Sequence, residues 1–222
     1  MGGHVIPLAV WQAPRRQVTL PAPRAPRDGL TGTNLELVTP RRQQILDIAA
    51  ELFAARGFHG VSVAELGSAC GISGPALYKH FESKDAMLAE MLVSISETLL
   101  AEGRSRVAGA EGPREALEAL VEWHIEFAID HRALIVVQDR DWSNLPDEAR
   151  ERVRALQRAY VDVWATQVRR HDPTLSPEAS RTRAHVLFGL LNSTPHSGRL
   201  PDRQMHDVLR DMAHGALGLA HT

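Results

Sequence analysis

The chain has 222 residues, of which 44% are hydrophobic and 23% charged, the composition of a globular protein with a sizeable core. No apolar run approaches the roughly 18 residues of a membrane span, and the first residues lack the apolar stretch of a secretory signal, so we expect a cytoplasmic protein with no membrane partner. The net charge of −2 conceals a gradient: residues 1–39 carry +2, residues 40–84 carry +1 and residues 85–222 carry −5. Because the acidic remainder would repel phosphate, any nucleic-acid contact is expected in the N-terminal quarter.

Residues 1–38 interleave five prolines with four arginines, a composition that neither forms a helix nor packs a core. We interpret them as a disordered basic arm. Two roles remain open for this arm. It could follow DNA phosphates or enter a minor groove, as homeodomain arms do, or it could be a tail without function.

The first helix is predicted to begin at Pro40, where the missing N–H of proline is harmless, and to end at Gly57. Ser62 can cap a second helix, with Glu65 completing a capping box three residues later. Gly71 then marks a sharp turn, because glycine takes a positive φ at no steric cost. The pattern up to this point indicates two helices followed by a tight turn.

A short third helix is predicted after Ser73, and a fourth after Ser83, with apolar residues recurring on one face as far as Leu99. Two helices joined by a glycine-containing turn of three or four residues form a helix-turn-helix, whose second helix enters the major groove of DNA. An ordinary pair of antiparallel helices in a bundle has the same outline. The spacing alone therefore leaves a DNA-binding and a purely structural interpretation open.

Glycines at 103–112 favour a boundary between a small first domain and a larger helical one. The run Leu134–Val137 fits a strand by periodicity, but its setting among helices favours a short helix. Long amphipathic helices are predicted at about residues 113–131, 146–171, 176–191 and 202–217. The chain is thus predicted to be all-α, with about nine helices and no sheet.

The motif itself carries a family resemblance. GPALYKHFESKDAML closely resembles the recognition-helix signature of the tetracycline-repressor (TetR) family, and AAELFAARGFHGVSVAELGSACGIS follows the first two helices of that family. The resemblance covers about residues 40 to 92. It implies a DNA-binding transcriptional regulator with a disordered arm at 1–38, a helix-turn-helix domain at 39–85 and a helical ligand-binding and dimerisation domain at 86–222.

The resemblance also implies which residues meet DNA. Ser73, Gly74 and Pro75 would approach base edges, and Ala76 replaces a threonine found in many relatives, so one phosphate hydrogen bond would be missing. Phosphate contacts are implied at Ser62, Tyr78, His80 and Lys84, with added charge from Lys79 and further contacts from Arg41 and Arg42. Tyr78 could instead serve the core alone, and His80 could be a solvated or capping residue.

The resemblance assigns the C-terminal domain two further tasks. Dimerisation through the last two helices would place two recognition helices on a palindromic operator, and Gly189 would let helices approach closely. An alternative is that these apolar stripes pack within one subunit. A small, lipophilic effector, lipid-derived or an acyl-CoA, would bind among residues that otherwise form an aromatic core: Trp123, His124, Phe127, Trp142, Tyr160, Trp164, Phe188 and Asn192. The stretch FGLLNSTPHSG is similar to relatives that regulate lipid or acyl-CoA catabolism.

Two other functions were weighed. An enzyme could use His124, Asp130 and His131 as metal ligands, but they lack an H-E-x-x-H-type spacing and a fourth ligand, and no nucleophile elbow or phosphate-binding glycine loop occurs. We therefore expect no catalytic residues, no metal and no cofactor. An adaptor that has lost DNA binding is the second alternative, against which Tyr78, Lys79 and Lys84 argue.

Overall fold

The computed structural model describes residues 40–198 and 200–219, and the predicted arm at 1–38 lies outside these residues. The described residues form nine α-helices and one 3₁₀ turn, without a strand, which confirms the all-α prediction. The elements are α1 (Pro40–Arg56), α2 (Val63–Ala69), α3 (Gly74–Leu77), α4 (Lys84–Gly109), α5 (Pro113–Asp130), α6 (Arg132–Asp141), η1 (Trp142–Asn144), α7 (Asp147–His171), α8 (Pro177–Leu191) and α9 (Asp202–Leu217). The run at 134–137 lies inside α6 and is therefore helical, as its setting suggested.

Serine side chains set the starts of the motif helices. The Ser62 hydroxyl accepts the Glu65 N–H at 3.3 Å, and the Glu65 carboxylate accepts the Ser62 N–H at 2.8 Å, so the predicted capping box is present. The hydrogen bonds from Ser62 lower the pKa of Glu65 to about 2. Ser73 and Ser83 cap α3 and α4 in the same way. Gly71 turns the chain between α2 and α3 with φ of 67°.

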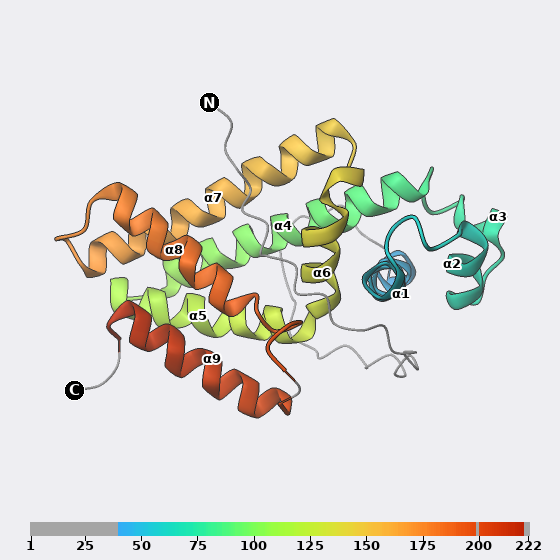
Figure 1. Ribbon diagram of the computed structural model, residues 1–222. Coiled ribbons are helices and arrows are strands. Elements are labelled where there is room, and N and C mark those ends of the chain that lie inside the picture. Colours follow the sequence, from blue (N-terminus) through green and yellow to red (C-terminus); the bar gives the residue numbers. More distant parts are fainter. Residues whose placement is uncertain (1–39, 199, 220–222) are drawn as a thin grey trace.

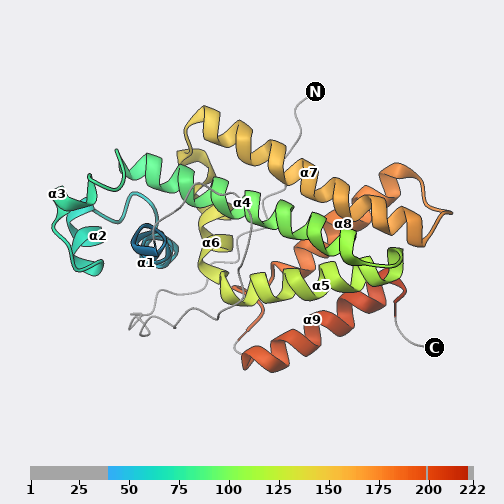
Figure 2. The same ribbon diagram turned by 180° about the vertical axis from the view of Figure 1, so that it is seen from behind.

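Helix α4 connects the two ends of the molecule. It starts beside the small helices α1–α3 and runs to the far end, with α7 on one side and α5 on the other (Figures 1 and 2). Helices α8 and α9 cover α7 and α5, respectively, and complete the larger bundle. Helix α6 lies between this bundle and α1, against which it packs.

The buried residues form two main clusters. The first joins α1–α3 to the early turns of α4, as far as Leu92, and to Val137, Leu145 and Val153 from the α6–α7 region. The second fills the space between α4, α5, α7, α8 and α9. The first core thus extends well beyond residue 85, because α6 and the start of α7 supply one of its walls.

Helix α2 and the start of α3 approach each other closely at Gly67. A Cβ atom at this position would lie 2.9 Å from the backbone nitrogen of Gly74 and 2.9 Å from the carbonyl oxygen of Ile72. Both neighbours are backbone atoms, which cannot rotate away as a side chain could. The absence of a side chain at Gly67 therefore sets the distance between α2 and the start of α3.

We expect Gly67→Ala to lower the free energy of unfolding by about 1–3 kcal/mol, the usual range for overpacking a buried site. Urea denaturation measures this loss. Gly109→Ala is the matched control, because a Cβ at Gly109 meets no atom within 4 Å. Equal stability of the two variants would show that α2 and α3 are not packed this closely.

Candidate nucleic-acid interface and sensor core

The predicted base-reading and phosphate-binding residues of the motif lie at the N-cap of α2, in and around α3 and at the start of α4, at one end of the molecule (Figure 1). Exposed side chains include those of Ser62, Ser73, Pro75 and Lys79, whereas Gly74, His80 and Lys84 are half-buried. Leu77, in the same short helix, points into the core and is buried. Helix α3 is therefore held by Leu77, while the polar residues on either side of it, Ser73, Tyr78 and Lys79, are exposed to solvent.

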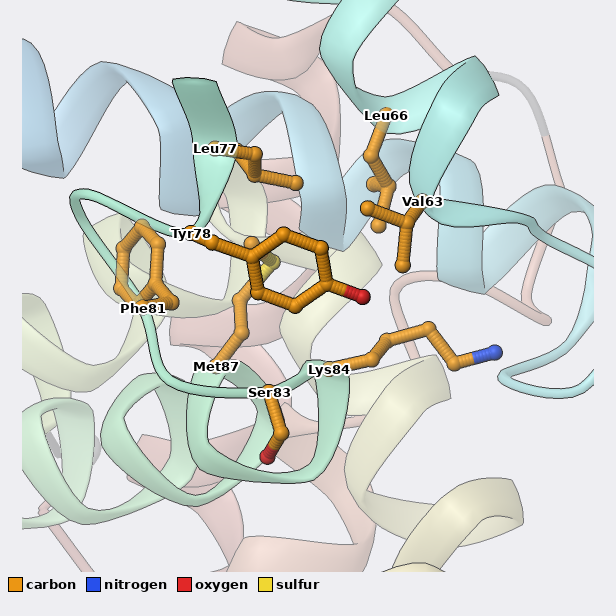
Figure 3. A pocket seen from close by; sticks show the side chains of 8 residues that line it. All are labelled: Val63, Leu66, Leu77, Tyr78, Phe81, Ser83, Lys84 and Met87. Carbon is orange, nitrogen blue, oxygen red and sulfur yellow. The ribbon is translucent and has the colours of Figure 1, made fainter. Parts of the chain in front are cut away.

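Tyr78 is 55% exposed, so it is not a core residue in the ordinary sense. Its ring lies beside a shallow hollow, with the hydroxyl and the Lys84 ammonium extending to the same side (Figure 3). The hollow is lined by Val63, Leu66, Leu77, Tyr78, Phe81, Ser83, Lys84 and Met87. The apolar lining supports the ring while the hydroxyl stays accessible to a phosphate.

The two arginines at the start of α1 have partners within the protein. Arg41 donates to the carbonyl oxygen of Cys70, at the end of α2. The Arg42 guanidinium forms a two-pronged ion pair with Glu90 of α4, with 2.6 Å between Nε and Oε1, and also donates to the carbonyl oxygen of His80. It lies 4.2 Å from the centre of the Phe81 ring. Arg42 thus joins α1, the turn after α3 and α4.

Lys84 is held in a similar way. Its Nζ donates to the carbonyl oxygens of Phe58 at 2.8 Å and Val61 at 2.9 Å, and lies 4.3 Å from the centre of the Phe58 ring. An ammonium group has three donors, so one remains for a phosphate. No local sequence pattern indicates these internal bonds, and DNA contact by Arg41, Arg42 and Lys84 stays a prediction.

His124 occupies the centre of the second core. It is fully buried, and its ring centre lies 5.1–6.0 Å from those of Phe127, Tyr160, Trp164 and Phe188. Its Nε2 is 3.1 Å from Oδ1 of Asn192, and its Nδ1 is 3.2 Å from the hydroxyl of Tyr160. Because a carbonyl oxygen only accepts, Nε2 carries the proton and Nδ1 accepts from Tyr160.

Burial decides the charge of this cluster. Loss of hydration lowers the pKa of His124 to about 4, so the imidazole is neutral near pH 7. Burial raises the pKa of the Tyr160 hydroxyl above its ordinary value, so that group is neutral as well. The polar groups at the centre of the aromatic core therefore carry no net charge.

Two predicted ligand-binding residues lie apart from this cluster. Trp142 belongs to η1 and packs against the first core, where the Arg154 guanidinium lies 5.6 Å from its ring centre. The grouping of Trp142 with the sensor aromatics was therefore wrong, because the turn after α6 directs it toward α1. Trp123 lies beside Arg106 of α4, with 5.4 Å between guanidinium and ring centre. The structure brings together His124, Phe127, Tyr160, Trp164, Phe188 and Asn192.

Sequence reasoning missed the importance of Gly103 to the second core. A Cβ atom at Gly103 would lie 2.5 Å from Cε2 of Tyr160, so the tyrosine ring rests directly on the backbone of α4. A glycine in the middle of a long helix, costing about 1 kcal/mol relative to alanine, was the signal that could have revealed this contact. Through it, the aromatic cluster touches the helix that leads to the DNA-binding motif.

Among the described residues, no three His, Cys, Asp or Glu side chains gather as they would around a metal ion. Nor is any described helix both long and apolar enough to cross a membrane.

Comparison with known proteins decides the family. Residues 45–91 match the family described as bacterial regulatory proteins, tetR family, and residues 110–217 match the tetracyclin repressor-like C-terminal domain. The chain belongs to the TetR family. TetR-family proteins are transcriptional regulators rather than enzymes, in agreement with the expectation from sequence.

Two curated relatives illustrate the likeness in sequence. The chain is 36% identical over 126 residues to the transcriptional repressor KstR2 of Rhodococcus jostii, covering 56% of this chain and 61% of the relative. It is 30% identical over 131 residues to KstR2 of Mycobacterium tuberculosis H37Rv, covering 57% and 66%. The matched part spans less than two thirds of either relative.

Solved structures extend the likeness to the TetR fold. A TetR-family regulator from Bordetella parapertussis superimposes with a TM-score of 0.71 at 24% identity, covering 82% of this chain and 99% of that one. AibR, solved in complex with isovaleryl coenzyme A and operator DNA, gives a TM-score of 0.65 at 24% identity, covering 78% and 97%.

The buried neutral histidine makes stability depend on pH. The unfolded chain protonates His124 near pH 6.5, whereas the folded chain protonates it only near pH 4, so acid favours unfolding in that interval. As pH falls from 6.5 to 4, we expect the wild type to lose free energy of unfolding faster than His124→Gln, by up to about 1.4 kcal/mol per pH unit. Urea denaturation at a series of pH values measures both curves, and parallel curves would contradict a buried neutral His124.

Proposed function

We propose that this protein is a transcriptional repressor of the cytoplasm that binds a palindromic operator as a homodimer and is released by a small lipophilic metabolite. The observation that carries the proposal is the motif of α2 and α3, whose apolar faces are buried while Ser73, Pro75, Tyr78 and Lys79 remain exposed. Repression is proposed because the KstR2 relatives are named repressors.

The proposed DNA contacts are of two kinds, contacts to base edges and contacts to phosphates. The start of α3, with Ser73, Gly74 and Pro75, would approach base edges, where Gly74 permits close backbone approach and Pro75 supplies only apolar surface. Lys79 and the Tyr78 hydroxyl would anchor the protein on phosphates, which adds affinity for every sequence. The segment 40–84 carries +1 and residues 85–222 carry −5, so this end of the molecule is the favourable one for a polyanion.

The proposed dimer contact uses α8 and α9. Large apolar side chains are exposed there: Val186 by 62%, Met212 by 55% and Val208 by 43%. A Cβ atom at Gly189 or Gly215 would meet nothing within 4 Å, so no other part of the described chain packs against either helix at these positions. Apolar residues at such positions suit a self-complementary contact between two copies of the chain.

The proposed effector would bind in the cluster around His124. This core offers aromatic faces and a neutral hydrogen-bonding group, which favours an apolar ligand with one polar group over a charged one. A lipid-derived molecule or the acyl part of an acyl-CoA has that character, with any phosphate outside the core. AibR, a protein of the same fold, was solved with isovaleryl coenzyme A, and KstR2 of Mycobacterium tuberculosis, another protein of this fold, is a ketosteroid transcriptional regulator.

The effector would act by shifting a population. A ligand that separates the rings around His124 displaces Tyr160, which rests on Gly103 of α4. A shift of α4 would move Glu90 and, with it, its ion-pair partner Arg42. Because Arg42 also donates to the carbonyl oxygen of His80, the turn after α3 would change its orientation. The shift away from DNA can be no larger than the difference in the ligand's affinity for the two conformations.

Salt-dependent binding tests the DNA-binding proposal. In mobility-shift titrations with the upstream region of its own gene, we expect the wild type to bind more weakly as salt rises, because binding releases counterions from phosphates. Lys79→Gln should weaken binding to all sequences alike and reduce the slope of log K against log salt by about one. Gln43→Ala, which changes an uncharged exposed residue of α1, is the control. No shift at any salt concentration would contradict the proposal.

The dimer contact has its own test. We expect Met212→Glu to convert the protein to a monomer in analytical ultracentrifugation, because a charge placed in an apolar interface loses its hydration without gaining a partner. Ala155→Glu adds the same charge to an exposed site on α7 and should leave the dimer intact. A Met212→Glu variant that remains dimeric at the concentration where the wild type dimerises would place the contact elsewhere.

A further inference from the structure

A buried carboxylate at the end of α6 connects that helix to the turn that precedes the DNA-binding motif. Asp141 is 4% exposed, and its Oδ1 accepts the backbone N–H of Phe58 at 3.3 Å. Its Oδ2 accepts a hydrogen bond from Nη2 of Arg140 at 3.0 Å. Asp141 and Phe58 are 83 positions apart in the sequence, so this bond joins two separate parts of the chain.

Arg140 extends the same connection to the end of α1. Its Nη1 donates to the carbonyl oxygen of Ala54 at 3.0 Å, and its Nη2 donates to that of Phe53. Carbonyl groups in the last turn of a helix lack intrahelical donors and form the negative end of the helix dipole, which favours a cation there. The pair Arg140–Asp141 therefore holds both the last turn of α1 and Phe58, which lies two residues beyond the end of that helix.

The turn that this pair holds leads directly into the motif. Phe58 is bound from both sides, because Asp141 accepts its N–H while Lys84 donates to its carbonyl oxygen at 2.8 Å. Lys84 also donates to the carbonyl oxygen of Val61, the residue before the Ser62 cap of α2. A second bond, 2.8 Å between His59 Nε2 and Asn144 Oδ1, joins the same turn to η1. The direction in which α2 leaves the turn thus depends on groups of the sensor domain.

We propose that Asp141 is a positioning residue for DNA binding. It acts through Phe58, fixes the turn at residues 57–61 and thereby sets the orientation of Ser62 and α2, although it lies outside the DNA-binding motif and has no role as a DNA contact. Its neighbour Arg140 orients the carboxylate and secures α1. The inference rests on the proposed function, in which the surface of α2 and α3 meets DNA.

The test compares Asp141→Asn with Asp139→Asn in the full-length protein. Asp139 lies two residues earlier on α6 and is exposed, so its change controls for the loss of one negative charge. We expect Asp141→Asn to weaken operator binding about tenfold, since an amide binds neither Arg140 nor the Phe58 N–H as strongly as a carboxylate. The slope of log K against log salt should equal that of the wild type, because no phosphate contact is removed.

Hydrogen–deuterium exchange supplies a readout that a general loss of stability would not give. The peptide covering residues 57–62 should exchange faster in Asp141→Asn, at a temperature where circular dichroism shows the variant fully folded, while peptides from α8 and α9 keep the wild-type rate. If Asp141→Asn does not fold, Arg140→Gln replaces it, because Arg140 is partly exposed and the glutamine amide can still donate a hydrogen bond to the buried Asp141 carboxylate. The same weakening at unchanged salt slope is expected.

The outcomes separate the inference from the proposed function. Wild-type affinity in a folded Asp141→Asn or Arg140→Gln variant, with unchanged exchange at residues 57–62, would overturn the positioning role alone. A flattened salt slope in Arg140→Gln would also overturn it, because Arg140 would then touch phosphate. Failure of the wild type to bind DNA would instead refute the proposed function.

Discussion

The peptide groups of the turn after α1 are the constraint on which the arrangement of the two domains depends. Polar backbone groups that are removed from water need partners, and Phe58, which is buried, obtains its partners from distant parts of the chain. Asp141 of α6 accepts its N–H, and Lys84 at the start of α4 donates to its carbonyl oxygen. A change in the position of either helix must therefore move the turn or break a buried hydrogen bond.

Helix α4 contributes buried residues to both cores. Its first turns pack with α1–α3. Glu90 of α4 forms an ion pair with Arg42, and Arg42 also donates to the carbonyl oxygen of His80, in the turn after α3. Farther along, Gly103 allows the Tyr160 ring to touch the helix backbone. The neutral aromatic cluster and the DNA-binding end are thus in contact with one continuous helix, while α6 provides a second, independent connection through Asp141.

Local sequence signals predicted the fold well. Caps and turns depend on residues a few positions apart, and so Ser62 with Glu65, Ser73, Ser83 and Gly71 could be assigned before the structure was known. The structure brings together the predicted cluster residues that lie on the inward faces of long helices, and their binding of a ligand stays a prediction. Trp142 lies apart from them, because it packs against the first core after the end of α6.

Partners of the charged groups could not be predicted in the same way. A lysine or arginine in the motif can bind a phosphate or a carbonyl oxygen, and only the tertiary structure shows that Arg41, Arg42 and Lys84 reach carbonyls of neighbouring segments. Asp141 gave no sequence signal, because its partner Phe58 is 83 positions away. Contacts of this kind depend on the relative placement of helices, which hydrophobic periodicity does not specify.

Selection of binding sites from random-sequence duplex DNA by the full-length protein is the most direct test of the central claim, that two copies of the chain present their recognition helices to one operator. We expect enrichment of an inverted repeat whose half-site centres lie about 10–10.5 base pairs apart, or a multiple of that spacing, so that both helices meet the same face of the duplex. Enrichment of single, unpaired half-sites, or no enrichment at all, would contradict it.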